Sequence, residues 1–107
     1  MANDYKNAKV DLTATSVTTL YTAPAAKTAI FKSILVSEDS GNADTITVTI
    51  TNAAAAVFSL FKVKAVAANT TIELLTQPLV VETGEIIKLT AATANRLHVV
   101  ASFMEIS

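Results

Sequence analysis

Polar and apolar residues alternate most regularly over residues 44–51. Threonine alternates there with branched apolar residues, in the order Thr45, Ile46, Thr47, Val48, Thr49, Ile50. A period of two is typical of a β-strand with one buried face, and β-branched threonine also favours strands. The pattern predicts a strand whose isoleucine and valine side chains face the core and whose threonine side chains face outward.

A turn precedes this strand. Residues 38–43 are mostly short and polar, and Gly41 and Asn42 both tolerate a positive φ. Residues 28–37, before the turn, have the composition of a longer strand. We predict that residues 28–37 and 44–51 pair as a β-hairpin.

Further short strands are expected along the chain, separated by turn residues such as Pro24, Pro78 and Gly84. They span residues 10–13, 17–22, 57–66, 70–75, 79–81, 86–91 and 97–106. The alanines at 53–56 are too short a run to nucleate a helix, and we expect a loop there. The pattern predicts one all-β domain over residues 10–107, an antiparallel β-sandwich or jelly roll of about seven or eight short strands.

Residues 1–9 are polar and lie outside this pattern of strands. We predict an N-terminal arm, which either reaches across to a neighbouring subunit or frays as a free end. These residues lack the apolar segment of a secretory signal.

The last strand is apolar on both faces. One face would carry Leu97, Val99, Ala101 and Phe103, and the other Val100, Met104 and Ile106. One face fills the core. The second is covered either by a loop of the same chain or by a neighbouring subunit, and the pattern does not decide between them.

Charged residues are scarce. They make up 16% of the 107 residues, against about 25% in ordinary domains, and the net charge is −1. A net charge near zero favours association, so we expect other subunits to cover part of this surface and the protein to be a homo-oligomer. Cysteine is absent, which excludes disulfides and thiol chemistry and fits folding in a reducing cytoplasm.

Nucleic acid and membranes are not expected as partners. The pI is about 5.7, and Lys and Arg do not cluster. No apolar run approaches the ~18 residues that a membrane span needs. We therefore expect a soluble protein.

Candidate catalytic and metal-binding residues are few. His98 is the single histidine, and no nucleophile pattern surrounds it, so we interpret it as a structural residue of its strand. Glu38, Asp39, Asn42 and Asp44 surround Gly41 and offer oxygen ligands, but their spacing does not fit a calcium loop. We predict no metal, no cofactor and no enzymatic activity.

Two other kinds of site have weak support. A pair of carboxylates for glycoside hydrolysis would have to come from Glu73, Glu82, Glu85 and Glu105, and no pair among them stands out. A carbohydrate-binding platform would need Trp or Tyr; Trp is absent, and Tyr5 and Tyr21 are far apart in the sequence.

Two segments resemble a known family. Residues 20–34, LYTAPAAKTAIFKSI, are similar to the segment LYTAPAGKTAIVKSI of small structural proteins of tailed bacteriophages. Residues 73–87 resemble that family's pattern of Glu-Leu-Leu, then Pro-Leu-Val, then a Gly turn, and the similarity extends over residues 10–106. Ala26 stands where the family has Gly, which leaves open whether the turn has a positive φ there.

The resemblance implies a β-sandwich present in many copies on a virion, assembled in the host cytoplasm. The expected function is that of a capsid decoration (cement) protein, whose partner is the major capsid protein or another virion protein. One alternative is a tail, neck or baseplate adaptor. The other is a carbohydrate-binding module on a receptor-binding part of the virion.

Overall fold

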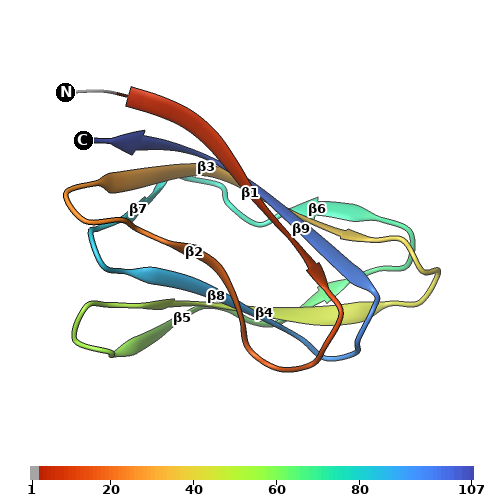
Figure 1. The fold of residues 1–107 in the computed structure, drawn as a ribbon. Coiled ribbons are helices and arrows are strands. Elements are labelled where there is room, and N and C mark those ends of the chain that lie inside the picture. The colour runs from red at the N-terminus through yellow and green to blue at the C-terminus, as the bar shows by residue number, and fades with distance from the viewer. Residues whose placement is uncertain (1–2) are drawn as a thin grey trace.

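The computed structural model describes residues 3–107, which form two antiparallel β-sheets packed face to face (Figure 1). The strands are β1 (Asn3–Leu12), β2 (Thr18–Thr22), β3 (Thr28–Glu38), β4 (Asp44–Thr51), β5 (Val57–Val66), β6 (Thr71–Glu73), β7 (Leu79–Val81), β8 (Ile86–Ala91) and β9 (Leu97–Ile106). Residues 3–107 contain no helix. The predicted all-β sandwich is confirmed, with nine strands rather than seven or eight.

The two sheets are built largely from strands that are distant in the sequence. Sheet A has the order β1-β9-β3-β6, with β7 also paired to β3, and sheet B has the order β2-β8-β4-β5. The first and last strands are therefore neighbours, and the start of β1 and the end of β9 lie at the same end of the sandwich (Figure 1).

The predicted hairpin between residues 28–37 and 44–51 is wrong. β3 pairs with β6, β7 and β9 in sheet A, whereas β4 pairs with β5 and β8 in sheet B. The turn between β3 and β4 carries the chain across the core, from one sheet to the other. Apart from the buried Glu38 and Asp44 at the turn, both strands have an apolar inner row. Stacking these rows face to face buries more apolar surface than pairing the strands edge to edge.

Residues 3–9 are not a separate arm. They form most of β1, which pairs with β9 in an unbroken register from Asn3 opposite Ile106 to Leu12 opposite Leu97. The side chains are exposed because β1 is the edge strand of sheet A, and this exposure explains their polar composition. Residues 1 and 2 of the predicted arm lie outside the described residues.

The inner rows of both sheets form one core. In β4, Ile46 and Val48 are fully buried and Ile50 packs partly buried against them, as predicted, while the alternating threonines lie on the outer side. Phe31 and Phe103 stack at a centroid distance of 4.6 Å, and Tyr21 packs against both rings. The two predicted faces of β9 are also confirmed: its core row is buried, and its outer row is partly exposed.

The turn at Ala26 has the backbone conformation that favours glycine. The Lys27 N–H donates to the Pro24 carbonyl at 3.2 Å, and Ala26 has φ of +62°. The alanine therefore keeps the positive φ despite the cost of its Cβ in this region.

Truncation of the core row of β4 tests the alternation. We expect Ile46→Ala to lower the free energy of unfolding by about 2–5 kcal/mol, because Ile46 is fully buried. Thr49→Ala, on the outer face of the same strand, should cost less than about 1 kcal/mol. Urea unfolding followed by circular dichroism measures both. A larger loss for Thr49→Ala would show that the strand register is wrong.

Replacing the strained alanine tests the turn. Ala26→Gly should raise the free energy of unfolding by about 0.5–1 kcal/mol, because relief of the positive-φ strain exceeds the added entropy of the unfolded chain. Ala25→Gly, at the adjacent position of the same turn, should lower it. Thermal unfolding of the two variants provides the comparison, and equal effects would argue against a strained Ala26.

Candidate functional site

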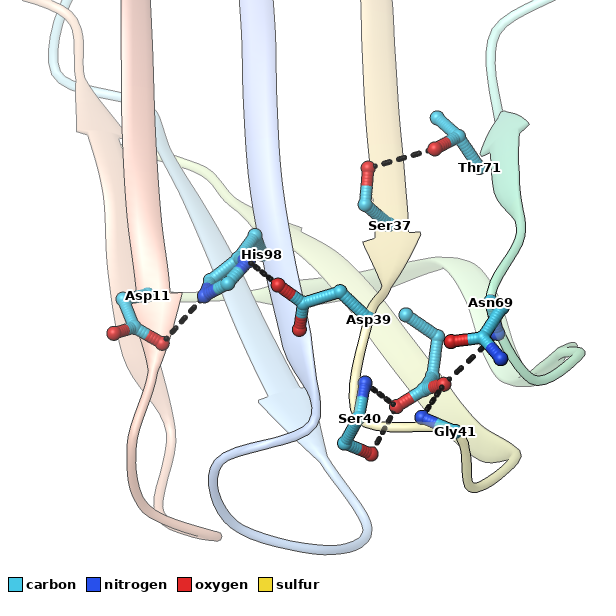
Figure 2. Close-up of polar contacts among 9 residues, drawn as sticks. Asp11, Ser37, Asp39, Ser40, Gly41, Asn69, Thr71 and His98 are labelled. Carbon is cyan, nitrogen blue, oxygen red and sulfur yellow. Dashed lines mark hydrogen bonds and ion pairs between the residues drawn. The ribbon is translucent and has the colours of Figure 1, made fainter.

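His98 lies on the outer face of β9, between two carboxylates (Figure 2). Its Nε2 is 3.2 Å from Asp11 Oδ1, and its Nδ1 is 3.5 Å from Asp39 Oδ2. All three side chains are substantially exposed to solvent. The two carboxylates flank the ring, one from β1 and one from the turn after β3.

Glu38 is buried at the same end of the sandwich and accepts several backbone hydrogen bonds. Its carboxylate accepts from the N–H groups of Ser40, Gly41 and Asn69 at 2.9, 3.1 and 3.0 Å, and from the Ser40 hydroxyl (Figure 2). Burial by itself raises the pKa, but these hydrogen bonds outweigh it and lower the pKa of Glu38 to about 2. The anion therefore ties the turn after β3 to the loop before β6.

The residues weighed as calcium ligands have separate partners. Glu38 binds backbone N–H groups, Asp39 contacts His98, and Asp44 Oδ2 accepts from the Thr93 N–H at 3.1 Å. Within residues 3–107, no three His, Asp or Glu side chains are grouped so that they could hold a metal ion. The acidic turn is explained by its hydrogen bonds to the backbone.

The candidate glutamates are also distributed over the fold. Glu105 is buried at the opposite end of the sandwich, where Lys6 Nζ donates to it at 2.7 Å and the Tyr21 hydroxyl at 2.6 Å. Lys6 and Tyr21 lower the pKa of the Glu105 carboxyl, and burial together with this bond raises the pKa of Tyr21. Glu73 accepts from the Ile34 N–H at 2.8 Å and thereby fills the gap along β3 between β6 and β7.

The two tyrosines do not form a platform for a sugar. Tyr21 packs in the core, whereas Tyr5 is 82% exposed on the outer face of sheet A. A cavity of about 430 Å³ lies between β5 and residues 73–79, and Phe61 is the aromatic side chain in its lining. The geometry gives no stacking surface made of tyrosine.

Apolar side chains instead gather on the outer face of sheet A. The strand registers place Tyr5, Met104, Ile30 and Val80 side by side across β1, β9, β3 and β7, and we call this set the apolar row. A second set, the mixed row, crosses β1, β9, β3 and β6 and consists of Lys9, Val100, Leu35 and Glu73. Val80 is 52% exposed, and Leu35 and Val100 are each 39% exposed. Ile30, Met104 and Ile106 are partly buried, whereas Tyr5, Val80, Leu35 and Val100 are exposed, so residues 3–107 leave much of this apolar face open to solvent.

A second exposed apolar surface lies at the tip of the β4–β5 hairpin. The tip consists of residues 52–58, in which four alanines are followed by Val57 and Phe58. Val57 is 62% and Phe58 54% exposed, and no charged residue occurs between Asp44 and Lys62. The hairpin tip itself carries no charge and lies at the end of the sandwich where β9 ends (Figure 1), with Ala53 beside Gly84 of the turn between β7 and β8.

Sequence reasoning identified the apolar outer side of β9 but missed both surfaces as units. The apolar row joins residues from 5 to 104, and only the pairing of distant strands brings them together. The hairpin tip had a visible signal, since the uncharged stretch around residues 52–58 can be seen in the sequence.

Comparison with known proteins adds no relative. No protein-family model matches the chain, and no curated protein matches it significantly. Within residues 3–107, no helix is long and apolar enough to cross a membrane. The resemblance to phage structural proteins therefore stays a prediction.

The Glu38 carboxylate makes stability depend on pH. Its folded pKa of about 2 lies below the ordinary value of 4.5, so its stabilising effect is complete above that value and is lost as the pH falls toward 2. We expect Glu38→Gln to be less stable than the wild type at pH 7, with a difference that shrinks between about pH 5 and about pH 2.

Urea unfolding at several pH values measures this difference. Other carboxylates titrate in both proteins, so their effects cancel in the comparison. Ser40→Ala removes one donor and should give a smaller loss over the same pH range. A difference between wild type and Glu38→Gln that does not change with pH would show that the anion is not preferentially stabilised.

Proposed function

We propose that this protein is a structural component of a tailed-bacteriophage virion, a capsid decoration (cement) protein that binds the head shell. The observation that carries the proposal is the exposure of two separate apolar surfaces, the apolar row and the hairpin tip, on a domain with few charges. Exposed apolar patches mark contact sites for other proteins. A subunit that binds a shell and also contacts its neighbours needs at least two such surfaces.

The sequence resemblance supports the virion as the location. The segments around residues 20–34 and 73–87 are similar to those of small phage structural proteins, and the observed sandwich agrees with the fold that this resemblance implies. The partner in this proposal is the major capsid protein. Assembly takes place in the host cytoplasm.

The hairpin tip is the surface that we assign to the shell. It lies at one end of the sandwich, carries no charge of its own and exposes Val57 and Phe58, so docking of these side chains needs little desolvation of polar groups. The paired strands behind it support the tip, which reduces the entropy lost on binding.

Binding to heads that lack the protein tests the function. We expect saturable binding at high copy number and greater resistance of the heads to rupture by heat. Phe58→Ser should weaken this binding about tenfold or more, because an exposed aromatic anchor is lost. Ser59→Ala, the neighbouring exposed position on β5, is the matched control and should bind like the wild type.

The alternatives predict different results in the same preparations. A protein that ignores heads but co-purifies with tails, at low copy number per particle, would replace the cement function with that of an adaptor. Selective binding on a glycan array, without binding to heads, would favour the carbohydrate-binding module.

A further inference from the structure

The outer face of sheet A has a distribution of charge and apolar surface that complements itself. The mixed row begins with Lys9 at the β1 edge and ends with Glu73 at the β6 edge, with Val100 and Leu35 between them. The apolar row lies parallel to it, with Met104 and Ile30 at its centre. In both rows, two residues lie on each side of the boundary between β9 and β3.

We propose that this face binds a second copy of the chain, about a two-fold axis that runs parallel to the strands between β9 and β3. Such a rotation reverses the order of the strands and keeps each position along them. Lys9 then lies opposite the partner's Glu73, a carboxylate that also accepts from the Ser33 hydroxyl and from the Ile34 and Leu75 N–H groups of its own chain. Val100 lies opposite the partner's Leu35. In the apolar row, Met104 lies opposite the partner's Ile30. Each contact occurs twice.

The charges favour this two-fold axis over the second two-fold axis that can lie in the plane of the face. A two-fold axis in the plane of the face but perpendicular to the strands would place Lys9 at the same edge of the interface as the partner's Lys9. It would also place the apolar row of one copy opposite the mixed row of the other. Rotation about the strand direction instead pairs opposite charges at both edges and brings Val100 onto Leu35 and Met104 onto Ile30. Between these apolar pairs lies a polar row, in which the exposed Lys32 of β3 lies opposite the partner's Ser102 on β9 and not opposite the partner's Lys32. Like charges placed opposite each other disfavour the wrong arrangement.

The size of the face sets the expected affinity. Strands are spaced about 4.8 Å apart and rise about 3.3 Å per residue. About eight residues from each of β1, β9 and β3, with the three each of β6 and β7 beside β3, give about 500 Å² per copy. The total of about 1,000 Å² is near the lower limit for a specific interface. We therefore expect a dimer with a dissociation constant in the micromolar range.

The edges of the sheets are poor alternatives for self-association. β1 is a long, unbroken edge, but it carries Asp4, Lys6, Lys9 and Asp11, and β2 has five residues and a register shift. β5 is broken by two register shifts and carries Lys62 and Lys64, and β6 and β7 have only three residues each. Such features protect edge strands from pairing with other chains. The inference concerns self-association alone and holds whether or not the protein binds heads.

Sedimentation of the purified protein over a range of concentrations measures the dimer. Val100→Lys should weaken dimerisation about tenfold or more, because it places charges at the centre of the interface. Val57→Lys makes the same change at the hairpin tip and should leave the dimerisation constant unchanged. Leu35→Lys provides a second variant of the centre, and circular dichroism checks that all three variants are folded.

Cross-linking locates the contact. The chain has no cysteine, so Ser102→Cys introduces one thiol beside the proposed axis, between the two rows. A short bis-maleimide should join two copies of this variant. Ser59→Cys places the thiol in sheet B, on β5, and should give little cross-linked product.

The inference fails if the protein is a monomer up to millimolar concentration, or if Val100→Lys leaves dimerisation unchanged. It also fails if Ser59→Cys cross-links as readily as Ser102→Cys. Should Val100→Lys abolish binding to heads without affecting self-association, the face would bind the shell, and the proposed function would survive while this inference would not.

Discussion

Strand β9 pairs along both of its edges, with β1 on one side and β3 on the other, and these two ladders set the geometry of sheet A. The registers align the inner rows, so that Phe103 stacks on Phe31 and Glu105 reaches Lys6 of β1. The same registers align the outer rows, since side chains alternate between the faces of every strand. A shift of one residue would turn the core row outward and destroy both faces at once.

Two buried carboxylates stabilise opposite ends of this sandwich by different means. Glu38 depends on backbone N–H groups and a hydroxyl from two loops, whereas Glu105 depends on the charge of Lys6 and the hydroxyl of Tyr21. Both carboxylates are satisfied, as burial of a charged group requires. Neither is free to act as an acid or base on another molecule, so the chemistry of these groups serves the fold.

The edges of the sheets are protected from pairing with other chains, whereas the outer face of sheet A is open. Register shifts, lysines and short strands protect the edges, while the outer face of sheet A leaves Tyr5 and Val80 exposed. Association through such a face can be specific and limited in number, because two faces that cover each other leave nothing for a third copy. Association through edges would extend without limit.

From residue 10 onward the sequence by itself determined most of the strands, because the alternation over β4 and β9 depends only on which side of a strand is buried. It also revealed the scarcity of charge and the uncharged stretch at the hairpin tip. Tertiary structure alone decided which strands pair. The turn residues 38–43 suit a hairpin and a crossing between sheets equally well, so the pairing of β3 with β4 was wrongly predicted. Polar residues 3–9 suit an arm and an edge strand equally well. The apolar and mixed rows join residues from both ends of the chain, and no local pattern contains that information, because strand partners are chosen by burial of the whole core.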